Sequence, residues 1–163
     1  MLYILTTGGT IEGVDDDITN NNSGDTNFLF KDFLETANVS FDYAIEEVIK
    51  KDSRLISTTD RESLATKIKD ADSDRILITH GTYTMEDTAE YIGTLKLNKT
   101  IVLTGSFVLG SSTKTDAPFN LGYAISSLQF LQPDVYVAMN GEIFHWSNVT
   151  KNLETNKFQR KNA

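Results

Sequence analysis

The sequence predicts one domain of the α/β class, built on a doubly wound, mostly parallel sheet. The chain has 163 residues, which is enough for one domain with a core and too few for two of average size. Short uninterrupted runs of Ile, Leu and Val recur along it, as in strands that are buried on both faces. Segments with helical periodicity separate these runs, and such alternation is typical of a parallel, Rossmann-like sheet.

The apolar runs predict strands at 2–5, 75–79, 100–104 and 134–139. A further strand is expected at 41–49, although charged residues interrupt that pattern. Helices are expected at 60–71, 85–95 and 119–131. Thr59 and Glu62 fit a capping box at the start of the first helix, and Pro118 fits the first turn of the last one.

Two stretches depart from this alternation within the predicted domain, which spans 1–163. Residues 12–27 are dense in Asp, Asn and Gly, which favours a mobile surface loop. The tail from about Gly141 carries Phe144, Trp146 and Phe158 among polar residues, and we expect a terminal hairpin or an irregular arm there.

Composition excludes several classes of function. The net charge of -8 argues against a nucleic-acid partner, because phosphate binding relies on clustered Lys and Arg. Cysteine is absent, and the two histidines lack the spacing of a metal site, so we expect no metal and no cofactor. No apolar run approaches the ~20 residues of a membrane span, and the apolar start lacks the basic residues of a signal peptide. A cytoplasmic location is the resulting expectation.

Three predicted strands end in a threonine that is followed closely by glycine: TTGGT at 6–10, THGT at 79–82 and TGS at 104–106. The carboxyl edge of a parallel sheet is where open α/β folds bind ligands. Glycine lets backbone N–H groups approach a carboxylate, a phosphate or a developing oxyanion. A phosphate loop is one alternative, but neither GxGxxG nor GK[ST] is present. The other alternative is a tight turn in which Gly8 and Gly9 have only a steric role.

Segments 7–11 and 78–86 resemble the two signatures of the bacterial-type L-asparaginase family. The second signature normally reads HGTDTMEE, and this chain has HGTYTME from His80 to Glu86. The likeness continues through 98–105, through 116–121 and at Lys51-Asp52-Ser53, so that it covers most of the chain. It implies a short, single-domain member of the family.

The resemblance implies a role for each matching residue. Thr10 corresponds to the acyl-accepting nucleophile, while Thr82 and Lys99 correspond to a polar pair that activates the nucleophile or a water molecule. Substrate contacts are expected from four positions, namely Gly9, Ser53, Gly81 and Tyr83. In the family a loop also closes over the substrate and carries a tyrosine, and 12–27 has none.

Other readings of these residues remain open. Thr10 and Ser53 could act only as capping hydroxyls, and Lys99 could be a solvated loop lysine. His80, next to Gly81, is expected to fix the turn through a backbone hydrogen bond rather than act as a base.

Tyr83 replaces the aspartate that binds the substrate's α-ammonium group in the family. Loss of that countercharge removes a charged hydrogen bond of about 1.5 to 3 kcal/mol and predicts poor affinity for asparagine. Glu12 replaces a small residue and offers a compensating carboxylate near Thr10.

The main hypothesis is an asparaginase-type amidohydrolase that uses a threonine nucleophile on a small carboxamide, either asparagine or a related amide. The alternative is a catalytically impaired relative that binds an amino acid or an amide as a sensor or regulatory partner. A nucleotide-binding domain is disfavoured by the order of the motifs. We expect a small-molecule amide or amino acid as ligand, no nucleic acid and no membrane partner. We also expect a homo-oligomer, with a dimer favoured, because the aromatic tail offers apolar surface.

Overall fold

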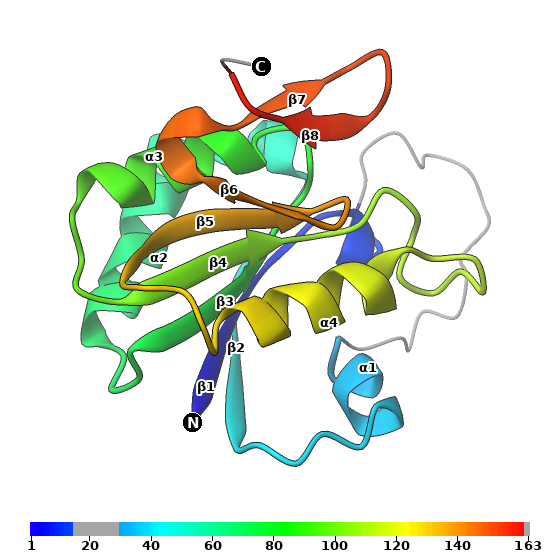
Figure 1. The fold of residues 1–163 in the computed structure, drawn as a ribbon, viewed down its shortest axis with the longest axis horizontal. Coiled ribbons are helices and arrows are strands. Elements are labelled where there is room, and N and C mark those ends of the chain that lie inside the picture. Colours follow the sequence, from blue (N-terminus) through cyan, green and yellow to red (C-terminus); the bar gives the residue numbers. More distant parts are fainter. Residues whose placement is uncertain (15–29, 162–163) are drawn as a thin grey trace.

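The computed structural model describes residues 1–14 and 30–161 and shows a six-stranded sheet in the order β2-β1-β3-β4-β5-β6 (Figure 1). The strands are β1 (Leu2–Gly8), β2 (Tyr43–Lys51), β3 (Arg75–Thr79), β4 (Thr100–Thr104), β5 (Asp134–Met139) and β6 (Glu142–His145). The first five are parallel and β6 is antiparallel to β5. The predicted α/β class with its mostly parallel sheet is therefore confirmed.

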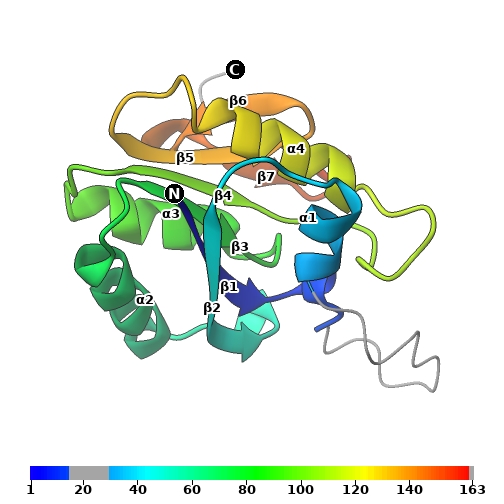
Figure 2. The same ribbon diagram turned by 90° about the horizontal axis from the view of Figure 1, so that it is seen from below.

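Helices cover both faces of this sheet (Figure 2). Helices α2 (Thr58–Asp70) and α3 (Met85–Thr94) pack on one face, against alternate strand residues such as Leu5, Ile78 and Ile101. Helices α1 (Lys31–Thr36) and α4 (Ala117–Ser127) pack on the other face, against Ile4, Leu77 and Val102. Because successive side chains of a strand point to opposite faces, these runs of continuous apolar residues supply both cores.

The beginnings of two helices show how local chemistry sets their bounds. Ser57 caps α2, and its side chain and that of Asp60 each accept a hydrogen bond from the other residue's backbone N–H. The capping box thus lies two residues before the predicted one at Thr59. Helix α4 begins at Ala117 with Pro118 in its first turn, as predicted. The sequence pattern predicts no element for α1, which has only 6 residues.

The tail folds back onto α3. After β6, a 3-10 helix (η3, Trp146–Asn148) leads into a hairpin of β7 (Thr150–Asn152) and β8 (Lys157–Gln159), seen above the sheet in Figure 1. Gly93 near the end of α3 leaves room for Trp146, since a Cβ at this position would lie 2.3 Å from the indole ring. Phe144 and Phe158 are buried. The tail aromatics therefore pack within the chain and do not supply the apolar surface on which the dimer expectation rested.

Most of the predicted loop at 12–27 lies outside the described residues. Glu12 ends a second 3-10 helix (η1, Thr10–Glu12), and Gly13 follows it with a positive φ of 76°. In the described part of the chain, no helix is long and apolar enough to cross a membrane.

Candidate active site

The site lies at the carboxyl ends of β1 and β3, which are neighbours in the sheet (Figure 1). The connection from β1 to β2 contains α1, and the connection from β3 to β4 contains α3 on the opposite face. The strand order therefore reverses between β1 and β3, and such a switch point is where open α/β sheets bind ligands. Thr10 follows β1 here, and Thr82 follows β3.

Two glycines bring the ends of these strands into contact. Gly9 has a φ of 77°, and a Cβ on it would lie 2.6 Å from the Cα of Gly81. Only glycine tolerates both the positive φ and this close approach of the Gly81 backbone. Thr10 and Thr82 each come directly after one of these touching glycines. The N–H of Gly9 donates to the carbonyl of Lys51 at 3.0 Å, so the contribution of Gly9 is close approach rather than a free donor.

Ser53 joins the same corner from the end of β2. It begins a 3-10 helix (η2, Ser53–Leu55) that is capped by Asp52. A Cβ on Gly81 would lie 2.6 Å from the hydroxyl oxygen of Ser53, so the two residues are in contact. That hydroxyl is buried and has no hydrogen-bond partner among the described residues, which is costly for a polar group unless a ligand supplies one.

Thr82 is paired with a lysine from the tail. The Nζ of Lys151 in β7 donates to the hydroxyl oxygen of Thr82 at 2.9 Å. The backbone N–H of Lys151 donates to the carboxylate of Glu86 at 2.6 Å, which fixes the hairpin against the first turn of α3. Burial lowers the pKa of Lys151, and the nearby charge of Glu86 opposes this shift. A lysine with a lowered pKa is more often neutral near pH 7, as a general base requires.

Lys99 does not belong to this corner, contrary to the sequence-based expectation. Its Nζ donates to the carbonyls of Ala71 at 2.5 Å and Ser73 at 3.0 Å. Lys99 directly precedes β4, so it lies at the amino edge of the sheet, and the 5 residues of that strand separate it from the edge with Thr82. The lysine bonded to Thr82 is Lys151, a residue for which the sequence analysis assigns no role.

Tyr83 directly follows Thr82 and lies at the surface, with 49% of the residue exposed. Two cations approach its ring: the guanidinium carbon of Arg54 lies 4.6 Å from the centroid and the Nζ of Lys151 lies 4.4 Å from it. Tyr83 therefore occupies the expected carboxylate position with a neutral ring that attracts cations already present in the chain.

His80 supports the turn, as expected. Its Nδ1 lies 2.8 Å from the carbonyl oxygen of Gly81, and its Nε2 lies 2.8 Å from the hydroxyl of Thr88. Burial lowers the pKa of His80 to about 4, so the ring is neutral at pH 7 and holds the Gly81 turn in place. The threonines that end the strands are also structural, since Thr7 donates to the carbonyl of Thr79 and Thr104 donates to that of Ala138.

The Glu12 carboxylate is bound by Thr79. The hydroxyl of Thr79 donates to its carboxylate at 2.5 Å, and Glu12 lines a surface hollow together with Phe30 and Glu47. Burial raises the pKa of Glu12 to about 7, while the hydrogen bond from Thr79 opposes this shift. Glu12 therefore does not replace the missing carboxylate at Tyr83.

The Glu12→Gln variant is expected to gain stability over the wild type at alkaline pH. The pKa of Glu12 is higher in the folded state than in the unfolded state, so folding favours the protonated form of this carboxyl group. That stabilisation is complete below about pH 4.5 and is lost as the pH rises through about 7. Thermal unfolding at pH 5 and pH 8.5 should show a larger gain for the variant at pH 8.5 than at pH 5, by about 1 to 3 kcal/mol. The exposed Glu62→Gln substitution on α2 is the control, and an equal effect of Glu12→Gln at both pH values would contradict the assignment.

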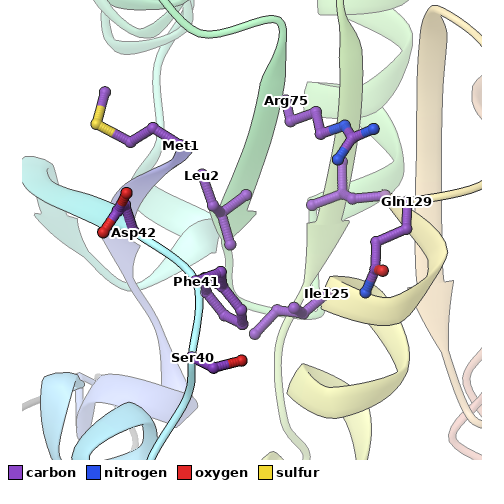
Figure 3. Close-up of a pocket in the computed structure, with 9 residues that line it drawn as sticks. Met1, Leu2, Ser40, Phe41, Asp42, Arg75, Ile125 and Gln129 are labelled. Atoms are coloured by element: carbon purple, nitrogen blue, oxygen red, sulfur yellow. The ribbon is translucent and has the colours of Figure 1, made fainter.

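A second hollow lies at the opposite edge of the sheet (Figure 3). Its walls come from the amino ends of β1 and β3, from 40–42 and from the end of α4, with Phe41 and Ile125 pointing toward each other. It contains none of the residues expected to bind or convert a substrate, and we assign it no part in the reaction.

By its fold and site, the chain is an α/β domain that presents two threonine hydroxyls, one of them bonded to a lysine, at the switch point of its sheet. Residues 1–162 match the family described as asparaginase, N-terminal. The chain therefore belongs to the asparaginase family.

Known proteins resemble it over nearly its whole length. L-asparaginase 2 of Escherichia coli strain K12 is 34% identical over 167 residues, covering 94% of this chain and 47% of that protein. The structure of the thermostable L-asparaginase from Thermococcus kodakarensis matches with a TM-score of 0.82 at 28% identity, covering 99% of this chain and 51% of that one. The structure of a probable cytoplasmic L-asparaginase from Campylobacter jejuni matches with a TM-score of 0.76 at 29% identity. This match covers 98% of this chain and 51% of that one. The chain thus spans about half the length of these relatives.

Proposed function

We propose that the chain carries the site of an asparaginase-type amidohydrolase, which hydrolyses a small carboxamide to a carboxylate and ammonia with Thr10 as nucleophile. The observation that carries the proposal is the hydrogen bond from Lys151 to Thr82, next to the loop of Thr10. A threonine hydroxyl is a weak nucleophile and needs a base within reach. Lys151, with its lowered pKa, is that base, and Thr82 connects it to the corner.

The reaction takes place in two steps. The oxygen of Thr10 attacks the amide carbon, and its proton passes through Thr82 to neutral Lys151. The protonated lysine returns a proton to the leaving nitrogen, the carbon–nitrogen bond breaks, and ammonia departs from an ester on Thr10. Water then attacks the carbon of this ester and gives a proton to the same base. The base returns the proton to the oxygen of Thr10 as the ester bond breaks, and the carboxylate is released. Covalent catalysis thereby divides one difficult hydrolysis into two easier steps.

A second candidate function follows from Tyr83. Its ring, with Arg54 and Lys151 beside it, stands where the family binds an ammonium group. A chain that bound an amide or an amino acid without converting it would keep Ser53 as a ligand contact and would serve as a sensor or regulatory partner.

Ammonia release and ligand binding, measured on the same preparation, separate the two candidates. The proposed enzyme should release ammonia from at least one of asparagine, glutamine and succinamate, above the level of a Thr10→Ala blank. Binding detected by calorimetry without any ammonia release would favour the sensor. The predicted cytoplasmic location and the predicted dimer are separate proposals, which fractionation and light scattering test.

A further inference from the structure

The turn of Thr82 and Tyr83 is flanked by two basic side chains. The guanidinium carbon of Arg54 lies 4.6 Å from the Tyr83 ring centroid, and the Nζ of Lys151 lies 4.4 Å from it. A guanidinium group remains charged at any physiological pH and carries only hydrogen-bond donors. A positive group of a ligand placed beside Tyr83 would therefore face the donors of Arg54, which offer an ammonium group no acceptor.

The carboxylates on the elements that build the site are directed to other partners. Asp52 accepts hydrogen bonds from the Nε of Arg54 at 3.0 Å and from its Nη2 at 2.6 Å. Glu86 accepts a hydrogen bond from the backbone N–H of Lys151, and Glu12 accepts one from the hydroxyl of Thr79. Over 1–14 and 30–161, none of these three carboxylates forms a hydrogen bond with Ser53 or Tyr83.

Ser53 supplies an independent sign of a ligand. Ser53 is 1% exposed, and its hydroxyl has no hydrogen-bond partner within the described part of the chain. The hydroxyl faces Gly81, which touches Gly9 and directly precedes Thr82. A carboxylate oxygen of a ligand would accept from it and remove the cost of an unpaired buried group.

We propose that the site takes small carboxamides that carry a carboxylate but no α-ammonium group, which are monoamides of dicarboxylic acids such as succinamate. This inference rests on the proposed function and specifies its substrate class. Ser53 donates to the carboxylate, and the guanidinium group of Arg54 beside Tyr83 favours a negative group over a positive one. Within 1–14 and 30–161, the α-ammonium group of asparagine would find no carboxylate directed at it from Asp52, Glu86 or Glu12.

Binding of the two product acids tests the proposal without requiring turnover. Titration calorimetry should show succinate binding at least about tenfold more tightly than L-aspartate to the wild-type chain. Tyr83→Asp introduces a carboxylate for the ammonium group, and the preference for succinate should fall by about tenfold or more. Tyr83→Phe keeps the ring beside Arg54 and Lys151 and is the matched control, which should keep the wild-type preference.

Three binding results would overturn the inference. They are equal affinity of the wild type for L-aspartate and succinate, binding of neither acid at millimolar concentration, and an unchanged preference for succinate in Tyr83→Asp. Ammonia assays on asparagine and succinamate separate this failure from that of the proposed function. Equal hydrolysis of both amides would overturn the inference and keep the enzyme. Preferential binding of succinate without hydrolysis of either amide would support the ligand class and reject the catalytic function.

Discussion

The Thr10→Ala variant is expected to lose amide hydrolysis by at least about 10³-fold, because the proposed covalent ester forms on the hydroxyl that this change removes. Thr10 lies one residue after Gly9, and its carbonyl accepts a hydrogen bond from Gly110 at 3.2 Å. These backbone contacts do not depend on the side chain, so the fold should survive the change. The kcat should fall for every amide that the wild type converts, while the melting temperature stays within a few degrees.

Thr10→Ser is the matched variant for this prediction. It keeps a hydroxyl on the same backbone and should retain measurable activity. Hydrolysis by Thr10→Ala at the wild-type rate, or equal losses in both variants, would show that the hydroxyl of Thr10 is not the nucleophile.

The Lys151→Met variant is expected to lose about 10² to 10⁴-fold in kcat, the usual contribution of a general base. Methionine keeps much of the apolar stem beside Tyr83 and Phe107, but it removes the donor to Thr82. Lys99→Met is the matched control, because Lys99 lies at the amino edge and bonds the carbonyls of Ala71 and Ser73. That control is expected to affect stability rather than kcat.

The same lysine predicts a pH dependence. Burial lowers the pKa of Lys151, so the neutral base should form below the usual lysine range. The rate should rise with pH along a limb whose midpoint lies below about 10.4. A rate that is independent of pH between 6 and 10, or a larger loss from Lys99→Met than from Lys151→Met, would contradict this role.

The alternation of apolar and periodic segments was sufficient to predict the central sheet. Strands β3, β4 and β5 begin and end at the predicted residues, because buried parallel strands consist of continuous apolar runs. The start of α2 was less well determined, since Ser57 with Asp60 and Thr59 with Glu62 both satisfy the spacing of a capping box. Helix α1 is too short for its periodicity to stand out.

The lysine of the site shows what sequence reasoning missed and why. A residue that directly precedes a parallel strand lies at the amino edge, and a strand of 5 residues extends for about 16 Å. Lys99 directly precedes the strand at 100–104, so its position in the sequence already excludes it from the carboxyl edge. Lys151 reaches the carboxyl edge because the tail runs back along α3, from Trp146 at Gly93 to Lys151 at Glu86. That path depends on tertiary contacts, which no local pattern encodes.

Mass spectrometry of the acid-quenched reaction tests the central claim most directly, because it locates the covalent intermediate. Trypsin releases 1–31 as the first peptide of the chain, since Lys31 is the first basic residue, and this peptide contains Thr10. Peptide 1–31 is expected to gain the mass of the substrate's acyl group during turnover, and the gain should be absent in Thr10→Ala. An acyl group found only on a peptide without Thr10 would contradict this expectation.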